Sequence, residues 1–321
     1  MLKEANVLIT GGAGFIGSNI ARTLLDAGNT ITLVDNMRRN AMDHVLADYQ
    51  GRFDVIKADV THAEEIGNAI ASVRPTHIVH AAGIAGIDTV AKFPVDTITV
   101  NFIGTANVLS GAVAAGGIER IVCMSTSEIF GSNAFRPTEK TPASVGAVGE
   151  SRWVYAVSKL GAEHMAFAYH LQFNLNTVSL RPFNVYGPGQ VGEGAMSAFV
   201  SRAIKDQPII LNNDGGQIRS WCYVDDMVAG TILALTKPDA VGKAFNIGNP
   251  RASATMHSLA EQVRDILGSK SELRFETRAG ADVELRIPDI AYTNEILGFA
   301  PKVDLREGIL RTAADYRSRD I

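Results

Sequence analysis

Two side chains spaced one helical turn apart offer the clearest chemistry in this chain. Tyr155 and Lys159 belong to the run Tyr155-Ala156-Val157-Ser158-Lys159, and on a helix they share one face. A lysine ammonium beside a phenol lowers the pKa of the phenol, and a positively charged cofactor ring would lower it further. Because a free phenol has a pKa near ~10, such tuning is what makes a tyrosine useful as a base near pH 7.

Polar residues that directly follow an apolar run are expected to lie beside this pair. Arg120–Met124 has the pattern of a buried strand, and Ser125-Thr126-Ser127-Glu128 comes straight after it. In doubly wound sheets, ligands bind beyond the carboxyl ends of the strands. We therefore expect these four residues to face the reactive ring of a cofactor.

A glycine-rich turn near the start of the chain predicts a dinucleotide site. Gly11, Gly14 and Gly17 follow the apolar run Asn6–Thr10 and precede apolar residues at helical spacing. The first glycine permits a tight turn, the second lets the backbone approach a pyrophosphate, and the third lets helix and strand pack closely. The N-terminus of the following helix then offers free N–H groups to the phosphates.

An acidic residue at the end of the second expected strand indicates which dinucleotide binds. Asp35 follows Thr30–Val34 and lies 18 residues after Gly17. A carboxylate there binds the adenosine ribose hydroxyls and repels a 2′-phosphate, so NAD is favoured over NADP. Arg38 and Arg39 could hold such a phosphate, but we interpret them as solvated loop charges.

Alternating strand and helix patterns predict the fold that positions these residues. Expected strands are Asn6–Thr10, Thr30–Val34, Phe53–Lys57, His77–His80, Arg120–Met124 and Asn176–Leu180, with helices at Ala63–Val73, Val95–Ala115 and Val154–Phe173. This order is typical of an α/β protein with a Rossmann-type, doubly wound parallel sheet. We expect residues 1–180 to bind the dinucleotide and to carry the catalytic residues. Residues 181–321 should form mainly a smaller mixed α/β substrate-binding lobe, with some segments returning to the first domain.

Composition argues against several other classes of protein. The net charge of −4 gives no sign of a nucleic-acid or membrane surface, and Cys123 and Cys222 lie in apolar runs, as reduced core thiols do. No apolar stretch approaches the ~20 residues of a membrane span, and no signal peptide precedes the first strand. The histidines show no metal-ligand grouping, so no metal is expected. These features favour a cytoplasmic protein.

Motifs along nearly the whole chain resemble the extended short-chain dehydrogenase/reductase family, and within it the NAD-dependent nucleotide-sugar epimerases and dehydratases. Besides the glycine turn, Thr126 and Tyr155-x-x-x-Lys159, these motifs are His80-Ala81-Ala82, Asn101, Arg181–Pro188, Arg219 ahead of Tyr223-Val224-Asp225-Asp226, and Arg278 with Asp282. Family members usually read Arg-Pro-Gly-Asp where this chain reads Arg278-Ala279-Gly280-Ala281-Asp282, so one extra residue precedes Asp282.

The resemblance implies roles for particular residues. Tyr155 would take a proton from a sugar hydroxyl, Thr126 would hydrogen-bond the same oxygen, and Lys159 would tune Tyr155 and hold the nicotinamide ribose. NAD would contact Gly11, Gly14, Phe15, Ile16, Gly17, Asp35, Asn36, Asp59, Val60, Ala81, Ala82 and Asn101 in addition to Tyr155 and Lys159. The nucleotide sugar, expected to be a UDP-sugar, would contact Ser127, Asn184, Phe199, Arg219, Arg278 and Asp282. By analogy, two protomers would pair through the Val95–Ala115 and Val154–Phe173 helices as a homodimer.

Glu128 distinguishes the reactions that such enzymes share. Oxidation at C4 makes the sugar C5–H acidic, and an epimerase then needs no second base, whereas Glu128 is placed to act at C5. The 4,6-dehydratases carry Thr-Asp-Glu; this chain reads Thr126-Ser127-Glu128, as UDP-glucuronate decarboxylases do, with Arg152 three residues before Tyr155. The helix after Tyr155 has the general family pattern, not the decarboxylase pattern, and the chain resembles the UDP-N-acetylglucosamine 5,6-dehydratases of tunicamycin biosynthesis. We predict a dehydratase of that kind; a decarboxylase, a 4-epimerase and a non-catalytic NAD-binding sensor are the alternatives.

Several of these residues also have plainer structural interpretations. Asn101 could bridge backbone groups, His80 has the setting of a core histidine, and Phe199 lies in an apolar run. Arg219 could pair with Asp225 or Asp226, and Glu128 could merely order its own loop. The positions of these side chains in the fold distinguish the two interpretations.

Overall fold

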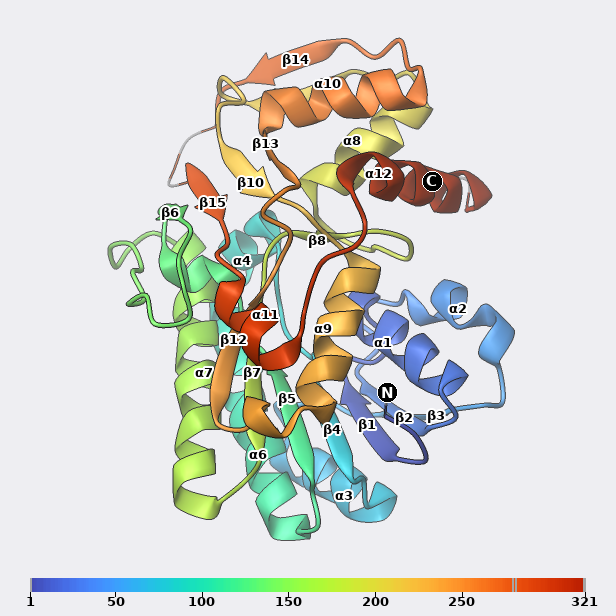
Figure 1. Ribbon diagram of the computed structural model, residues 1–321, viewed down its shortest axis with the longest axis vertical. Coiled ribbons are helices and arrows are strands. Elements are labelled where there is room, and N and C mark those ends of the chain that lie inside the picture. The colour runs from blue at the N-terminus through green and yellow to red at the C-terminus, as the bar shows by residue number, and fades with distance from the viewer. Residues whose placement is uncertain (1, 279, 281, 320–321) are drawn as a thin grey trace.

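A large parallel sheet forms the centre of the molecule in the computed structural model, which describes residues 2–278, 280 and 282–319 (Figure 1). Its strand order is β12-β7-β5-β4-β1-β2-β3, and every neighbouring pair is parallel. The strands are β1 (Asn6–Thr10), β2 (Thr30–Asp35), β3 (Asp54–Lys57), β4 (His77–His80), β5 (Arg120–Met124), β7 (Thr177–Pro182) and β12 (Lys243–Ile247). The expected α/β fold with a doubly wound sheet is confirmed.

Helices cover both faces of this sheet and create two apolar layers. One layer contains α3 (Ala63–Val73), α6 (Gly104–Ala115) and α7 (Arg152–Phe173), and the other contains α1 (Phe15–Asp26) and α9 (Val224–Thr236). Val7, Leu8 and Ile9 of β1 are fully buried, so this strand is apolar on both of its faces. A continuous apolar run of this kind is typical of an inner strand in a parallel sheet.

Shorter elements lie between the strands of the large sheet, with α11 alone coming after its last strand in the chain. They are α2 (Met42–Val45), η1 (Ala47–Tyr49), α4 (Ile87–Lys92), α5 (Pro94–Ile98), η2 (Thr99–Ile103), η3 (Ser127–Phe130), η4 (Pro238–Ala240) and α11 (Ala291–Leu297). The helix expected at Val95–Ala115 is divided by η2, a π-helical turn between α5 and α6. Such turns insert an extra residue into the helical register and are frequent at functional sites.

By length and composition alone, the Pro94–Ala115 helix is long and apolar enough to cross a membrane. Its mean hydropathy is 1.4 over an 18-residue window. The expectation that no apolar stretch approaches such a length was therefore wrong. Length and composition are weak indications of a span, because a core helix of a globular protein has both. In this fold α6 packs against α3 and α7, and 33% of that window is buried.

A second, smaller lobe lies beyond the carboxyl ends of the large sheet (Figure 1). A sheet of order β13-β10-β15-β6 contains β6 (Asn133–Phe135), β10 (Ile218–Ser220), β13 (Ser253–Thr255) and β15 (Leu285–Ile287). Two strand pairs accompany it, β8 (Val185–Tyr186) with β11 (Cys222–Tyr223) and β9 (Ile209–Asn212) with β14 (Leu273–Glu276). The helices of this lobe are α8 (Ala195–Ile204), α10 (Met256–Leu267) and α12 (Leu305–Ser318).

Helix starts in the small lobe follow from local sequence. The Thr255 side chain accepts a hydrogen bond from Ser258 N at the start of α10, and the Asp304 side chain accepts one from Glu307 N at the start of α12. Side-chain oxygens at these positions satisfy N–H groups that the helix itself leaves free. Gly268, with φ of +63°, then ends α10 in the left-handed conformation that glycine adopts most readily.

Chain segments cross between the two lobes in both directions. β6 belongs to the first half of the chain but pairs with β15 in the small sheet, whereas β12 belongs to the second half and pairs with β7 in the large sheet. A domain border near residue 180 therefore remains a functional prediction, with β12 as a returning segment.

Candidate active site

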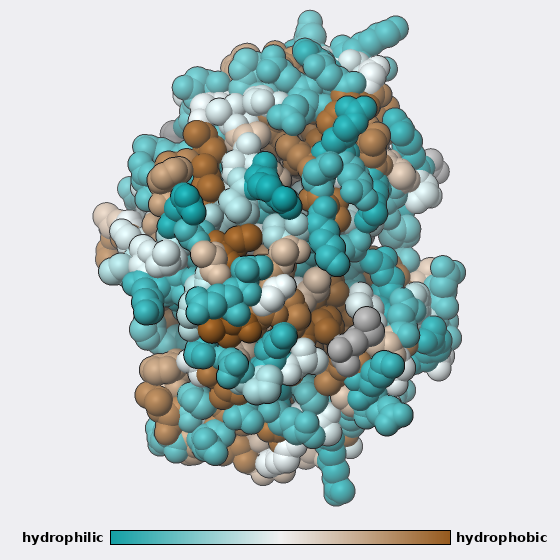
Figure 2. Space-filling model, in the orientation of Figure 1, coloured by the Kyte–Doolittle hydropathy of each residue, from teal (hydrophilic) through white to brown (hydrophobic). Residues whose placement is uncertain are grey.

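A cleft of about 1000 Å³ lies between the two lobes. In Figure 2, hydrophilic residues cover most of the face shown, and hydrophobic residues gather mainly along its middle. Most residues expected to bind ligands line this cleft: Gly11, Gly14, Phe15, Ile16, Gly17, Asp35, Asn36, Val60, Ala81, Ala82, Thr126, Ser127, Glu128, Tyr155, Lys159, Asn184, Phe199, Arg219, Arg278 and Asp282. Asp59 and Asn101 lie behind this wall.

Backbone contacts in the glycine turn leave no room for a side chain at Gly11 or Gly17. A Cβ atom on Gly17 would lie 2.2 Å from the Gly11 carbonyl oxygen, and one on Gly11 would lie 2.5 Å from Ala82 N. Gly11 also has φ of +68°. A Cβ on Gly14 would meet only the Gly11 oxygen, at 3.2 Å, among the described residues. Gly14 therefore leaves its open side to the cleft.

Asp35 connects the end of β2 to the glycine turn. Its carboxylate accepts hydrogen bonds from Ala13 N at 3.1 Å and from Met37 N at 2.8 Å. Burial raises the pKa of Asp35, and these backbone bonds oppose the shift. Asn36 donates to the Asp59 carboxylate at 2.8 Å, so Asp59 contacts the cleft wall through Asn36.

The two arginines after Asp35 have partners within the protein. Arg38 lies over the Phe93 ring at 5.2 Å and within 3.8 Å of Asp96. Arg39 donates to the Ala85 carbonyl oxygen and to the Thr89 hydroxyl, at 3.3 and 3.1 Å. The interpretation of both as merely solvated charges was too simple, because they attach to the loop and helices that follow β4.

Asn101 holds that loop from behind. Its side chain accepts from Ile84 N at 2.8 Å and donates to the Ile84 oxygen and the Ser158 hydroxyl, at 3.0 and 3.1 Å. The adjacent Gly83 lies so close that a Cβ there would be 2.9 Å from Lys159 Nζ. The Asn101 side chain therefore does not line the cleft itself. It acts on the cofactor side of the cleft by holding the backbone of Ile84, which does line it.

His80 is a core residue with a hydrogen-bond partner at each ring nitrogen, in agreement with the structural interpretation given for it above. Its Nδ1 lies 2.7 Å from the Thr10 hydroxyl and its Nε2 lies 2.9 Å from the Thr105 hydroxyl. Burial, with the charge of Lys159 as a second cause, lowers the pKa of His80 to about 3. The ring is therefore neutral and serves packing.

Tyr155 and Lys159 share one face of α7, next to the end of β5. Lys159 Nζ donates to the Met124 carbonyl oxygen at 2.8 Å, and burial lowers the pKa of Lys159 to about 8. Burial raises the pKa of Tyr155 to about 12, against the lowering effects of the Thr126 hydroxyl and of Arg286. The expected lowering by Lys159 is thus not seen in the protein alone, because burial penalises the phenolate. Base action by Tyr155 therefore needs a further positive charge in the cleft.

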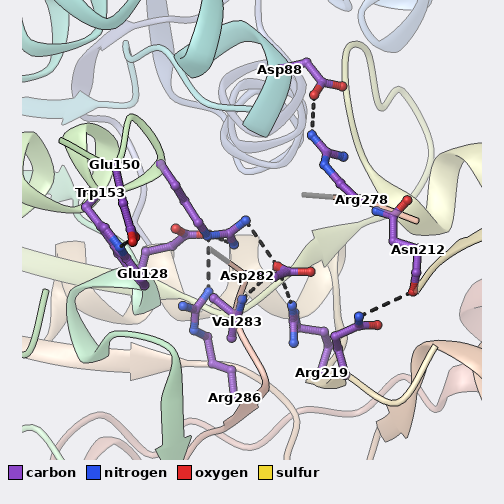
Figure 3. Close-up of polar contacts among 12 residues, drawn as sticks. Asp88, Glu128, Glu150, Trp153, Asn212, Arg219, Arg278, Asp282, Val283 and Arg286 are labelled. Carbon is purple, nitrogen blue, oxygen red and sulfur yellow. Dashed lines mark hydrogen bonds and ion pairs between the residues drawn. The ribbon is translucent and has the colours of Figure 1, made fainter. Parts of the chain in front are cut away.

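A buried arginine cluster, consisting of Arg152, Arg219, Arg286, Glu128 and Asp282, lines the same cleft as Tyr155. Figure 3 shows Glu128, Arg219, Asp282 and Arg286 of this cluster. Glu128 Oε1 is 3.4 Å from Arg152 Nη2 and 3.3 Å from Arg286 Nη1. Asp282 Oδ1 is 3.2 Å from Arg152 Nη1 and 3.3 Å from Arg219 Nη2. Three guanidinium groups against two carboxylates give the cluster a net charge of +1.

Each arginine of the cluster comes from a different element. Arg152 begins α7, Arg219 lies in β10 and Arg286 in β15. Arg286 has a side-chain exposure of only 2%, and it also donates to the Gly131 carbonyl oxygen at 2.9 Å. Burial, followed by the charge of Arg286, lowers the pKa of Arg219 to about 10. Arg219 therefore remains charged near neutral pH.

Sequence reasoning missed Arg286 as a site residue. The one signal for it is an arginine between two apolar residues in Leu285-Arg286-Ile287. Buried arginines need partners, so an arginine in a strand pattern indicates a buried acid or an anionic ligand nearby.

The remaining substrate-side residues differ in how far they reach the cleft. Ser127 is buried in η3, and Asn184 donates to the Ser220 carbonyl oxygen at 2.9 Å. Phe199 is 4% exposed and belongs to the apolar core, with part of its side chain on the cleft wall. Arg278 pairs with Asp88, as Figure 3 shows. In the Arg278–Asp282 motif, Ala279 and Ala281 lie outside the described residues.

The cofactor side has the features that a dinucleotide requires. α1 begins directly after Gly14 without a side-chain cap, so its first N–H groups are free for phosphate oxygens. The Ser125 hydroxyl is buried on the cleft wall and has no partner in the described part of the chain. The residues present therefore fit a dinucleotide whose phosphates lie at Gly14 and whose reactive ring lies near Ser125.

Known proteins with the same arrangement support this assignment. Residues 7–248 match the NAD dependent epimerase/dehydratase family. UDP-glucuronic acid decarboxylase 6 of Arabidopsis thaliana is 36% identical over 323 residues, 99% of this chain and 90% of that protein. UDP-glucose 4-epimerase of Thermotoga maritima, solved with UDP-glucose, has a TM-score of 0.90 and 26% identity over 100% of both chains. DesIV, a dTDP-glucose 4,6-dehydratase from Streptomyces venezuelae solved with NAD, has a TM-score of 0.88 and 29% identity over 99% of this chain and 97% of that one.

These matches also settle which dinucleotide belongs to the site. The matched family is NAD-dependent, and DesIV was solved with NAD bound. NAD as the cofactor, predicted from Asp35, is therefore confirmed.

Proposed function

The chain belongs to the NAD dependent epimerase/dehydratase family, and we propose that its reaction is the decarboxylation of a UDP-linked uronic sugar. One observation carries this proposal: Glu128 lies between the guanidinium groups of Arg152 and Arg286, inside a cluster with one unbalanced positive charge. A carboxylate on the sugar would neutralise that charge, whereas a C6 hydroxyl would not. The 36% identity to a plant UDP-glucuronic acid decarboxylase supports the same choice.

The side chains divide the work along the cleft. NAD, when bound, supplies the acceptor and later the donor of a hydride, together with a positive charge beside Tyr155. Tyr155 takes the proton of the C4 hydroxyl, and the Thr126 hydroxyl holds the same oxygen. Once C4 is a ketone, the C5 carboxylate is in the β position and leaves as carbon dioxide. Negative charge then develops on the C4 oxygen, where Tyr155 and Thr126 can donate hydrogen bonds.

The arginine cluster positions the leaving carboxylate. Arg152 and Arg286 offer several N–H donors, and the Nε atoms of both are buried without a partner in the described residues. Bidentate guanidinium–carboxylate pairs fix orientation as well as charge. Glu128, held between the two, would pass a proton from water to C5.

The second candidate is the dehydratase predicted from sequence, a UDP-N-acetylglucosamine 5,6-dehydratase such as that of tunicamycin biosynthesis. The observation in its favour is also Glu128, which lines the cleft two residues after Thr126 and can act on C5 or on a leaving C6 hydroxyl. A 4-epimerase of a neutral sugar is disfavoured, because it needs neither Glu128 nor a buried cationic cluster.

Product mass distinguishes the candidates directly. The purified protein with NAD is incubated separately with UDP-glucuronate, UDP-N-acetylglucosamine and UDP-galactose, and the products are analysed by mass spectrometry. We expect UDP-glucuronate to lose the mass of carbon dioxide. Loss of water from UDP-N-acetylglucosamine would instead establish the dehydratase, and unchanged mass with altered retention would establish the epimerase.

The Tyr155→Phe variant separates catalysis from a sensor role. Removing a general acid–base group typically costs about 10²- to 10⁴-fold in rate. We therefore expect turnover to fall by that factor while nucleotide-sugar binding, measured by calorimetry, stays within a few-fold. Full biological activity of this variant in cells would favour the non-catalytic NAD sensor.

We also propose that two protomers associate through α5, α6 and α7. Large apolar side chains are exposed on these helices, among them Val95 at 75% and Leu171 at 69%. Apolar area of this kind is typical of helices that pack against a second subunit. Light scattering of the purified protein should give twice the chain mass, and Leu171→Glu should shift it toward the monomer. The proposed cytoplasmic location would be tested by cell fractionation.

A further inference from the structure

A set of polar contacts joins the two lobes across one end of the cleft, and of its residues only Arg278 has been given a role above. We call Arg39, Asp88, Thr89, Glu193 and Arg278 the clasp; all five line the cleft. Glu193 Oε2 accepts a hydrogen bond from Asp88 N at 2.8 Å, and Glu193 Oε1 accepts one from Thr89 N at 2.9 Å. The Thr89 hydroxyl donates to Glu193 as well.

Two further contacts complete the clasp. Arg39, in the loop after β2, donates to the Thr89 hydroxyl at 3.1 Å. Arg278, which follows β14, pairs with the Asp88 carboxylate (Figure 3). Asp88 and Thr89 lie in α4 on the cofactor side, whereas Glu193 and Arg278 belong to the small lobe. The contacts therefore span the cleft.

Backbone packing shows that these loops are fitted to one another. Gly86 has φ of +110°, and a Cβ there would lie 2.8 Å from the Glu193 carboxylate carbon. Gly192 has φ of +85°, and a Cβ there would lie 3.0 Å from Arg39 Nη1. Glycine at both positions lets the two loops approach closely. Burial opposes ionisation of Glu193, but its hydrogen bonds from Thr89 and Asp88 and the charge of Arg39 hold its pKa below the usual range.

We propose that the clasp retains NAD: its contacts close the cofactor end of the cleft and must open before the dinucleotide can leave. Glu193 holds the start of α4, and the loop 83–86 that leads into α4 lies beside the catalytic pair, since Gly83 is next to Lys159 and Asn101. Opening the clasp would free the side of the cleft that adjoins the glycine turn. Glu193 is in this view a positioning residue that acts through α4.

Retention suits the chemistry of the site. Decarboxylation and dehydration with hydride return are both redox-neutral, so NAD need not exchange between turnovers. This argument rests on the proposed function, whereas the test below measures cofactor release without any sugar nucleotide. Failure of one can therefore be told from failure of the other.

The test measures how fast the cofactor leaves. The protein is loaded with NADH, an excess of NAD⁺ is added, and loss of the bound NADH fluorescence gives the release rate. We expect Glu193→Ala to release NADH about tenfold faster or more, because several charge-assisted hydrogen bonds are lost at one place. Thr89→Val, which removes the shared hydroxyl, should act in the same direction with a smaller factor.

A matched control lies in the same lobe away from the cleft. Asp206 accepts hydrogen bonds from Lys270 N at 2.7 Å and from the Ser269 hydroxyl at 2.9 Å, which is the same type of contact. Asp206→Asn should leave NADH release within about twofold. The clasp interactions are exposed and charged, so ~1 M salt should speed release more in the wild type than in Glu193→Ala, which keeps only the Arg278–Asp88 ion pair.

Two results would overturn the proposal. One is an unchanged release rate in Glu193→Ala and Thr89→Val when both variants keep the unfolding midpoint of the wild type. The other is an equal acceleration in Asp206→Asn, since that would show a general loosening of the lobe.

Discussion

The two sides of the cleft are built in different ways. On the NAD side, backbone segments in close contact determine the shape of the site. On the sugar side, charged side chains from distant elements determine its electrostatic potential. The glycine turn brings Gly17 against the Gly11 oxygen, and Gly11 against the backbone of Ala82. The arginine cluster instead gathers groups from η3, α7, β10 and β15, so Glu128 and Arg286 meet across 158 positions of sequence.

This difference teaches which kind of change each side tolerates. A backbone-built site has no room for added atoms but does not depend on the chemistry of most side chains. A site built from charged side chains is stabilised by its ion pairs, so removal of one partner leaves the other charge buried and uncompensated. The following three predictions test this contrast.

The largest effect is expected for Gly17→Ala. A Cβ at this position would lie 2.2 Å from the Gly11 oxygen, so the turn must move. Overpacking of this kind costs up to about 3 kcal/mol, which corresponds to roughly 100-fold weaker NAD binding by calorimetry. Gly67→Ala in α3, where a Cβ meets no described atom within 4 Å, should bind NAD normally and be slightly more stable. Normal NAD affinity in Gly17→Ala would contradict the backbone account.

A similar or somewhat smaller effect is expected for Arg286→Gln, on the opposite side. Loss of this charge leaves Glu128 with Arg152 alone, and we expect kcat to fall by about 10²-fold, the usual effect of losing one preorganised donor. NAD affinity should stay unchanged. Arg274→Gln, which breaks the exposed pair with Glu272, is the control and should leave kcat as it is. Reduced NAD affinity in Arg286→Gln would show that the two sides are not separate.

The smallest effect concerns His80, beneath the NAD side. Its pKa is about 3 in the fold, against an ordinary 6.5, so below pH 6.5 the unfolded chain binds a proton that the folded protein does not. Stability is therefore lost as pH falls from 6.5 toward 3, by at most about 1.4 kcal/mol per pH unit from this residue. Denaturant unfolding at pH 7 and pH 5 should show a smaller loss for His80→Gln, whose amide can still join Thr10 and Thr105. Equal losses would show that His80 is not the cause.

The same contrast explains what the sequence could reveal. β1, β4, β5 and α3 have the bounds expected from apolar pattern, because each is defined by its own residues. The π-helical turn at Thr99–Ile103 could not be read from periodicity, since it depends on how Asn101 is held against Ile84. Pairing of β6 with β15 was equally hidden, because it joins segments 152 positions apart at Asn133 and Leu285.

The candidate site divides in the same way. The glycine turn, Asp35 and the Tyr155–Lys159 pair were predictable because each is a local motif with a known geometry. Arg286 and the clasp could not be predicted, because their contacts form only when segments far apart in the sequence come together in the fold. The unexpected pKa of Tyr155, about 12, has the same origin, since burial depends on the whole fold.

The position of β12 at the edge of the large sheet has a consequence for biosynthesis. Residues 243–247 pair with β7, so a nascent chain that has emerged only as far as β7 presents an open strand edge. That edge stays available to wrong partners until another 65 residues, from 183 to 247, have been translated. Fragments that end between the two strands should consequently aggregate or be degraded, although they contain every residue that is expected to contact NAD.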